Sequence, residues 1–251
     1  NFLVVATTLG MIKMWDISRR EPRQLGAGTK FAEKDDVLLG NIISVKVNAD
    51  GSRVSVLSTK NRGNTVVPDT NVYVWFTDLH KIQGYDFGEA GRLPNSHFWD
   101  PQEPKLLGCE TSPQKKGADG GLKESSSAAE VTTLFVTPEA EVKLQDSFPL
   151  EKGYEALMGV QVPSLYFAFK RSDVEAYHAD RGGLESTLLA RTMRDFSGME
   201  ASQMDQETQQ ALLDFSYFLT IGNMDAAYQA VRLIKTSNVW RSRRQSGQRN
   251  V

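Results

Sequence analysis

Apolar and polar residues alternate along most of the first 170 residues, in short runs separated by turn residues. A period of two is typical of strands that pack on a sheet face. Asp50-Gly51 is the clearest hairpin turn between two such runs. The pattern predicts strands at Phe2–Thr7, Met11–Ile17, Ile42–Asn48, Arg53–Ser58, Asn71–Phe76, Lys81–Phe87, Ser96–Pro101, Lys105–Glu110, Thr132–Thr137, Val142–Phe148, Ala156–Val162 and Leu165–Lys170.

Tryptophan residues recur at the ends of these strands. Trp15-Asp16 ends one strand, and Trp75 ends another at the corresponding place. A strand that ends in Trp-Asp is typical of a WD40 propeller blade. Trp99-Asp100 falls in an early strand of its unit, so it is not equivalent to Trp15-Asp16. We expect all five residues to be structural, with Trp15 and Trp75 each filling the gap between adjacent blades.

The spacing of the two units requires loops. Trp15 and Trp75 are 60 positions apart, whereas a blade repeats about every 40–45 residues. Loop insertions at Ser18–Asp36 and Asn61–Thr70 would account for the excess. A third loop, Thr111–Glu130, is almost devoid of large apolar residues, and we expect it to be a disordered insert at about 111–130.

Helical spacing replaces the alternation after Met204. Gly222 is a good helix stop, and Asn223 or Asp225 can cap the helix that follows. Two short amphipathic helices of this kind predict an αα-hairpin of the tetratricopeptide (TPR) type. The seam between the two helices is predicted to contain Leu212, Phe215, Leu219, Ala227 and Ala230.

The fold class is therefore β followed by α. Residues 1–190 are predicted to form antiparallel four-stranded blades of a partial WD40-type β-propeller. Residues 191–205 would be a linker, 206–240 the first TPR-like hairpin, and 241–251 a basic, disordered tail. The chain begins at Asn1 directly in a strand pattern, so we expect it to be part of a longer protein.

Composition argues against several classes of partner. Lys and Arg number 29 against 31 Asp and Glu, a net charge of −2, so no global field attracts nucleic acid or an anionic membrane. No apolar run approaches the roughly 20 residues that cross a bilayer. The single cysteine, Cys109, cannot form an internal disulfide. A reducing cytosolic compartment suits this composition.

Candidate chemistry is sparse. The three histidines, His80, His97 and His178, lie far apart in the sequence without clustered ligands, so we expect no metal site. Cys109 follows Leu106 and Leu107 and is expected to be a small core residue. No phosphate loop or nucleophile elbow is present. We therefore expect no enzyme, no catalytic residue and no cofactor; a propeller hydrolase or lectin would need convergent His, Asp or Glu at the propeller axis.

Longer blocks of sequence carry a family resemblance. The stretch Leu213–Ala227 (LDFSYFLTIGNMDAA) resembles the intraflagellar transport protein 140 family, subunits of ciliary transport complex A. The same likeness covers Leu38–Val45, Phe98–Pro101 and Phe148–Pro163. The run from Arg241 departs from it and does not resemble a continuing solenoid, as a truncated or mis-spliced end would. The resemblance implies the closing blades of a second propeller joined to the start of a helical solenoid.

The resemblance also implies a function. Proteins of this family are scaffolds in retrograde intraflagellar transport, in cilium assembly and in ciliary entry of membrane proteins. Other complex A subunits would bind the propeller faces and the solenoid, with membrane-protein cargo or adaptors bound indirectly. The expected location is the cilium (axoneme and basal body) and the cytoplasm. A vesicle-coat or other trafficking subunit of the same architecture is the alternative.

Overall fold

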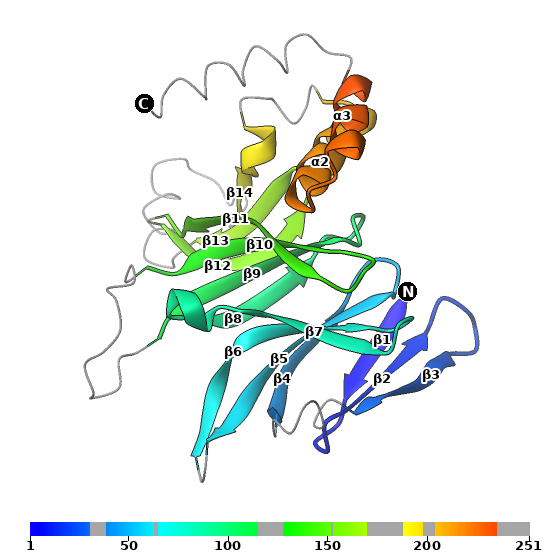
Figure 1. The fold of residues 1–251 in the computed structure, drawn as a ribbon. Helices are drawn as coiled ribbons and strands as arrows, with labels where there is room; N and C mark the ends of the chain where they lie inside the picture. Colours follow the sequence, from blue (N-terminus) through cyan, green and yellow to red (C-terminus); the bar gives the residue numbers. More distant parts are fainter. Residues whose placement is uncertain are drawn as a thin grey trace, which may run out of the picture.

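The computed structural model of the chain describes residues 1–30, 39–62, 65–114, 128–151, 153–169, 188–197 and 204–234. Within these residues, four antiparallel sheets follow one another, and two helices come after the fourth sheet (Figure 1). The predicted order of β structure followed by α structure is confirmed.

Each sheet is built from consecutive strands, so that neighbours along the chain are also neighbours in the sheet. Antiparallel strands allow this order because they need only tight turns between them. The first sheet contains β1 (Phe2–Ala6), β2 (Met11–Asp16) and β3 (Arg23–Lys30). The second contains β4 (Leu39–Val47), β5 (Arg53–Arg62), β6 (Thr65–Phe76) and β7 (Lys81–Asp86). The third contains β8 (Arg92–Trp99), β9 (Leu106–Pro113), β10 (Glu130–Val136) and β11 (Val142–Pro149). The fourth contains β12 (Tyr154–Gln161), β13 (Ser164–Phe169) and β14 (Leu188–Thr192). The helical elements are η1 (Gly88–Ala90), η2 (Arg194–Phe196), α2 (Gln206–Thr220) and α3 (Met224–Leu233).

The turn between β4 and β5 shows why the predicted hairpin forms. Gly51 has a φ of +79°, a left-handed conformation that glycine adopts without strain. The carboxylate of Asp50 accepts a hydrogen bond from the backbone N–H of Ser52 at 2.9 Å. Val47 then pairs with Val54 across the ladder. The hairpin prediction is confirmed.

Apolar side chains fill the space between the successive sheets. Ile12 of the first sheet packs with Trp75 of the second. Leu107 lies in the cluster between the second and third sheets, whereas its neighbour Leu106 lies in the cluster between the third and fourth. Neighbouring residues point to opposite faces of a strand. The middle sheets are therefore buried on both faces.

Polar side chains connect the second and third sheets. The indole Nε1 of Trp99 donates to the carbonyl oxygen of Lys46 at 3.1 Å. His97 Nε2 lies 2.8 Å from the hydroxyl of Ser44. Both bonds join β8 to β4, the first strands of their sheets. They satisfy groups that would otherwise be buried without a partner.

Two carboxylates connect the third and fourth sheets. Asp100 is 1% exposed, and its Oδ2 accepts from the backbone N–H of Val162 at 2.6 Å. Glu110 Oε2 accepts from the N–H of Leu157 at 2.7 Å. Burial raises the pKa of Glu110, and the Leu157 N–H opposes that shift. The third sheet is thus fixed to both of its neighbours by buried hydrogen bonds.

The first two predicted loop insertions contain strands. Residues 23–30 of the Ser18–Asp36 insertion form β3, which pairs with β2 although its sequence is polar and rich in glycine. The polar Asn61–Thr70 segment continues the β5–β6 hairpin, in which Arg62 pairs with Thr65. Both loop predictions were wrong because backbone pairing with a neighbouring strand forms these strands without strict alternation.

The third predicted loop also ends in strands. Thr111 belongs to β9 and pairs with Glu130 of β10. The side chain of Arg92 stabilises this part of β9, because its Nε donates to the Thr111 hydroxyl at 2.8 Å. The disordered insert cannot therefore extend from 111 to 130; residues 115–127 of it lie outside the described residues.

The second C-terminal helix begins at a predicted signal. The amide oxygen of Asn223 accepts from the N–H of Ala226 at 3.1 Å and caps α3, while Gly222 lies in the turn before it with a φ of +78°. The predicted linker 191–205 contains the end of β14 and η2, with Phe196 fully buried. Residues 235–251, which include the predicted tail, lie outside the described residues, as does His178.

The environment of His97 predicts a pH dependence of stability. Burial, assisted by the nearby Lys46, lowers the pKa of His97 from 6.5 to about 3. The unfolded chain gains this proton below pH 6.5, whereas the folded chain gains it only near pH 3. Stability is therefore lost as the pH falls through this window, by about 2 kcal/mol between pH 7.5 and 5.

Urea unfolding at pH 7.5 and 5 measures this loss. The same titration of His97→Gln, which has no imidazole, should lose about 2 kcal/mol less between the two pH values. An equal loss in both proteins would show that His97 is protonated in the folded chain.

Asp100 makes a second prediction. Asp100→Ala removes the acceptor of three backbone N–H groups, the buried one of Glu103 and the partly buried ones of Gln102 and Val162. We expect a loss of about 3 kcal/mol in the free energy of unfolding. Asp50→Ala is the matched control, because Asp50 closes a similar turn but is exposed, and it should cost about 1 kcal/mol. Equal losses in urea unfolding would contradict a role for Asp100 between sheets.

Candidate functional site: the junction of the sheets and the helices

The two blade tryptophans, Trp15 and Trp75, differ in which face of their sheet they lie on. Trp75 is 2% exposed and packs with Ile12 and Met14 of the first sheet. Trp15 is partly buried and lies opposite Leu3 in the β1–β2 ladder. Since Ile12 and Met14 face the second sheet, the alternating Trp15 faces away from it. Trp75 therefore fills a gap between the first and second sheets. Trp15 lies on the outer face of the first sheet.

The aspartates of the Trp-Asp pairs differ in their surroundings. Asp16 Oδ1 accepts from the N–H of Ser18 at 2.8 Å, and hydrogen bonds with Ser18 lower the pKa of Asp16. Asp100 closes the turn after β8 and also reaches the fourth sheet. The structure brings Trp99 and Asp100 together at the end of β8, but it does not gather the five predicted blade residues into one site.

The predicted helix seam is partly buried. Leu212, Ala227 and Ala230 are buried, whereas Phe215 is intermediate and Leu219 is 43% exposed. At the end of α2, Phe218 and Ile221 pack on the core cluster instead of Leu219. The helical spacing predicted Leu219 in the seam at this last turn, whereas the face that packs on the core is shifted by one residue to Phe218.

The apolar centre of the junction is a contact between α2 and the third sheet. The ring of Tyr217 meets Phe135 edge to face, with 5.3 Å between ring centroids. Leu212 of α2 belongs to the same cluster as Phe167 of the fourth sheet and Phe196 of η2. Burial raises the pKa of Tyr217, and nearby carboxylates raise it further. The helices are therefore packed on the core of the third and fourth sheets.

Lys105 forms a polar connection on one side of this contact. Its Nζ lies 3.0 Å from Asp214 Oδ1 and 4.6 Å from the centre of the Tyr217 ring. Glu103 accepts a hydrogen bond from Gln210 of α2 at 3.3 Å. The turn before β9 thus holds the outer face of α2 by charge, by cation–π attraction and by a hydrogen bond.

Asp195 forms a second polar connection through η2. Its Oδ2 accepts from Gln145 Nε2 of β11 at 2.8 Å and from the hydroxyl of Ser216 of α2 at 2.5 Å. Arg194 forms an ion pair with Asp146 of β11 at 3.0 Å. The segment predicted as a linker is therefore bonded to both the sheet and the helix, which restricts their relative motion.

The helices leave several large apolar side chains uncovered. Among the described residues, Leu219, Met224, Tyr228 and Leu233 are 43–66% exposed. Met224 and Tyr228 lie one turn apart on α3, whereas Leu233 lies on its opposite side, nine residues from Met224. Large exposed apolar side chains of this kind are typical of surfaces that pack against a further element.

The described residues contain no group of three His, Cys, Asp or Glu side chains that could hold a metal ion. Cys109 is buried between the second and third sheets, and burial raises the pKa of its thiol. None of the described helices is both long and apolar enough to cross a membrane. What the junction offers chemically is binding and positioning.

Sequence reasoning missed Lys105, Asp195 and their partners. Lys105 and Asp214 are 109 positions apart, and nothing in their local sequence distinguishes them from other exposed charges. The only available signal was the polar residues on one side of the apolar stripe of α2.

The junction predicts which aromatic residue of α2 matters most. Tyr217→Ala removes the contacts with Phe135 and Lys105 and should cost about 3 kcal/mol in the free energy of unfolding. Phe215→Ala should cost about 1 kcal/mol, because Phe215 is only half-buried. Urea unfolding followed by helical circular dichroism compares them, and a larger loss for Phe215→Ala would reverse our assignment.

Comparison with known proteins gives the family. Two solved structures are similar at 10% identity and cover 67% of this chain: the crystal structure of Chaetomium thermophilum Raptor (TM-score 0.31) and a chain of the Mitotic Checkpoint Complex (TM-score 0.30). This chain spans 17% and 70% of those chains, and likeness at this level carries no argument. The model of the family described as IFT140 second beta-propeller, by contrast, matches residues 1–91 and 88–170. The chain thus belongs to the IFT140 second β-propeller family.

Proposed function

We propose that this chain is a non-enzymatic scaffold within intraflagellar transport complex A, in which the junction fixes the direction of a helical array relative to the propeller. The observation that carries the proposal is the family match over residues 1–170. The junction supports it, because α2 is packed on the third and fourth sheets while Met224 and Tyr228 of α3 are exposed among the described residues.

The proposal includes the pathway and the location. The protein would act in retrograde ciliary transport, in cilium assembly and in ciliary entry of membrane proteins, at the axoneme and basal body and in the cytoplasm. Other complex A subunits would bind the propeller faces and the helices, and membrane-protein cargo would be held indirectly. Neither nucleic acid nor membrane insertion is part of this role, in keeping with the net charge of −2.

Co-purification from ciliated cells tests the role of the junction. In the tagged chain, Lys105→Ala combined with Asp195→Ala removes both polar connections to α2. Together these connections stabilise the orientation by about 1–2 kcal/mol, so recovery of other complex A subunits should fall about tenfold.

Lys143→Ala is the matched control, because its ion pair with Glu141 is exposed on β11. Equal recovery from the double variant and the control would remove the junction from the proposal. Recovery of Golgi or endosomal coat subunits in place of complex A subunits would support the vesicle-coat alternative.

A further inference from the structure

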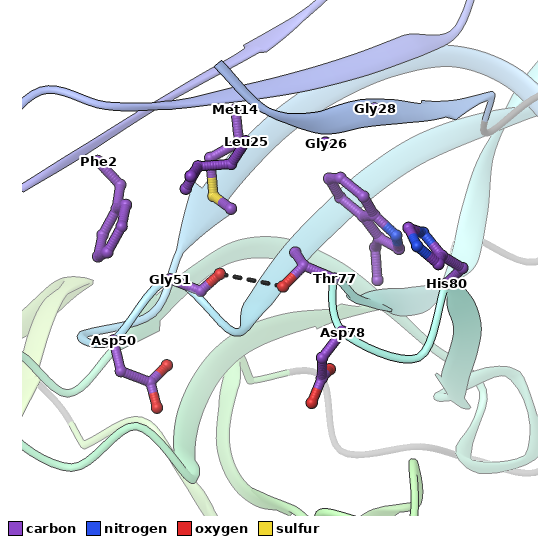
Figure 2. A pocket seen from close by; sticks show the side chains of 11 residues that line it. Phe2, Met14, Leu25, Gly26, Gly28, Asp50, Gly51, Thr77, Asp78 and His80 are labelled. Atoms are coloured by element: carbon purple, nitrogen blue, oxygen red, sulfur yellow. Dashed lines mark hydrogen bonds between the residues drawn. The ribbon is translucent and has the colours of Figure 1, made fainter. Parts of the chain in front are cut away.

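A cavity of about 250 Å³ lies between the first and second sheets (Figure 2). Phe2, Met14 and Leu25 line it from the first sheet. Asp50 and Asp78 belong to the two turns of the second sheet, and Figure 2 shows their carboxylates pointing away from Met14 and Leu25. The space is partly open to solvent, so it is a pocket at the edge of the contact between the two sheets.

An irregularity in β3 opens the cavity. Met14 pairs with Leu25 and Ile12 pairs with Thr29, so residues 26–28 have only Lys13 opposite them. Gly26 and Gly28 bound this bulge, both with left-handed φ, and a Cβ on Gly26 would meet no atom within 4 Å. At the positions of Gly26 and Gly28, β3 therefore has no side chain to fill the space.

The opposite wall is fixed and carries polar groups. The hydroxyl of Thr77 donates to the carbonyl oxygen of Gly51 at 3.2 Å and joins the two turns (Figure 2). Trp75, which also lines the cavity, is 2% exposed, and its Nε1 is buried without a described hydrogen-bond partner. The indole ring of Trp75 adds apolar surface to this wall.

Two carboxylates lie beside the cavity, and one of them, Asp78, forms an ion pair with Arg53 at 2.9 Å. Asp50 and Asp78 line the opening, and no Lys or Arg is among the described residues that line it. The carboxylate of Asp78 is 57% exposed beyond its ion pair with Arg53. An occupant that carries a cation next to an apolar group would match both the interior and the rim.

We propose that this cavity binds one apolar side chain of a partner protein segment that has Lys or Arg beside it. A cavity of about 150 Å³ accepts benzene, so this space accommodates a side chain the size of Leu or Phe. It is below the range of about 300–1,000 Å³ for drug-sized ligands, which favours a single anchor residue over a metabolite. The inference goes beyond the scaffold role and can be tested on the chain alone, whatever complex it joins.

Fluorescence anisotropy with labelled peptides tests the pocket on the 251-residue chain. The probe is GSKLKSG, with GSKSKSG lacking the apolar anchor and GSELESG reversing the charge. We expect saturable binding of GSKLKSG with a Kd below about 1 mM and at least about tenfold weaker binding of the other two peptides.

Variants of the chain then locate the binding. Leu25→Trp fills the cavity and should weaken GSKLKSG binding about tenfold. Asp50→Asn with Asp78→Asn keeps acceptors for Ser52 and Arg53 but removes the charges, and should weaken binding about three- to tenfold. Asp86→Asn is the matched control, a turn aspartate at the far end of β7, and should bind as the parent chain does.

Three outcomes would overturn the proposal: no saturable binding of GSKLKSG, equal binding of GSKSKSG, or parent-like binding by both pocket variants. Thermal melting of each variant shows whether it folds. If Leu25→Trp does not fold, the charge variant and the GSKSKSG comparison decide the question by themselves.

Discussion

The turn of residues 100–105 makes polar contacts with the second sheet, the fourth sheet and α2. The carboxylate of Asp100 binds the fourth sheet, the carbonyl of Pro104 accepts from Asn48 of the second sheet, and Lys105 binds α2. These bonds are buried or partly buried, and a displaced turn would leave several polar groups without partners at once. The relative positions of two sheets and the helices therefore depend on one short segment.

This turn can act in that way because it leads into β9, which like its neighbour β10 is buried on both faces. Leu106 and Leu107, and likewise Leu134 and Phe135, point into opposite clusters. Such strands have no solvent face on which to place their polar residues, so polar groups that occur there must bond across the sheets. Polar residues can be placed more freely at the turns, and the carboxylates of Asp100 and Glu103 lie in one of these turns.

Local signals in the sequence predicted most strands and the start of α3. Asp50-Gly51 and Asn223 needed only their neighbours to act, as a turn and as a cap. β3 was missed because its sequence is polar and glycine-rich, and only its pairing with β2 makes it a strand. The junction was missed for a related reason, since Lys105 meets Asp214 across 109 positions. Contacts that depend on the packing of distant elements leave no periodicity in the sequence.

The first and second sheets differ from this pattern in a way that bears on function. Large side chains such as Phe135 and Phe167 fill the space between the third and fourth sheets, whereas a glycine bulge and a cavity interrupt the packing beside Trp75. A scaffold needs both properties, since fixed geometry transmits orientation and an unfilled space gives a partner side chain somewhere to enter. The positions follow from the chain itself. The chain continues into α2 after the closely packed fourth sheet. The cavity lies between the first and second sheets, with the carboxylates of Asp50 and Asp78 beside it.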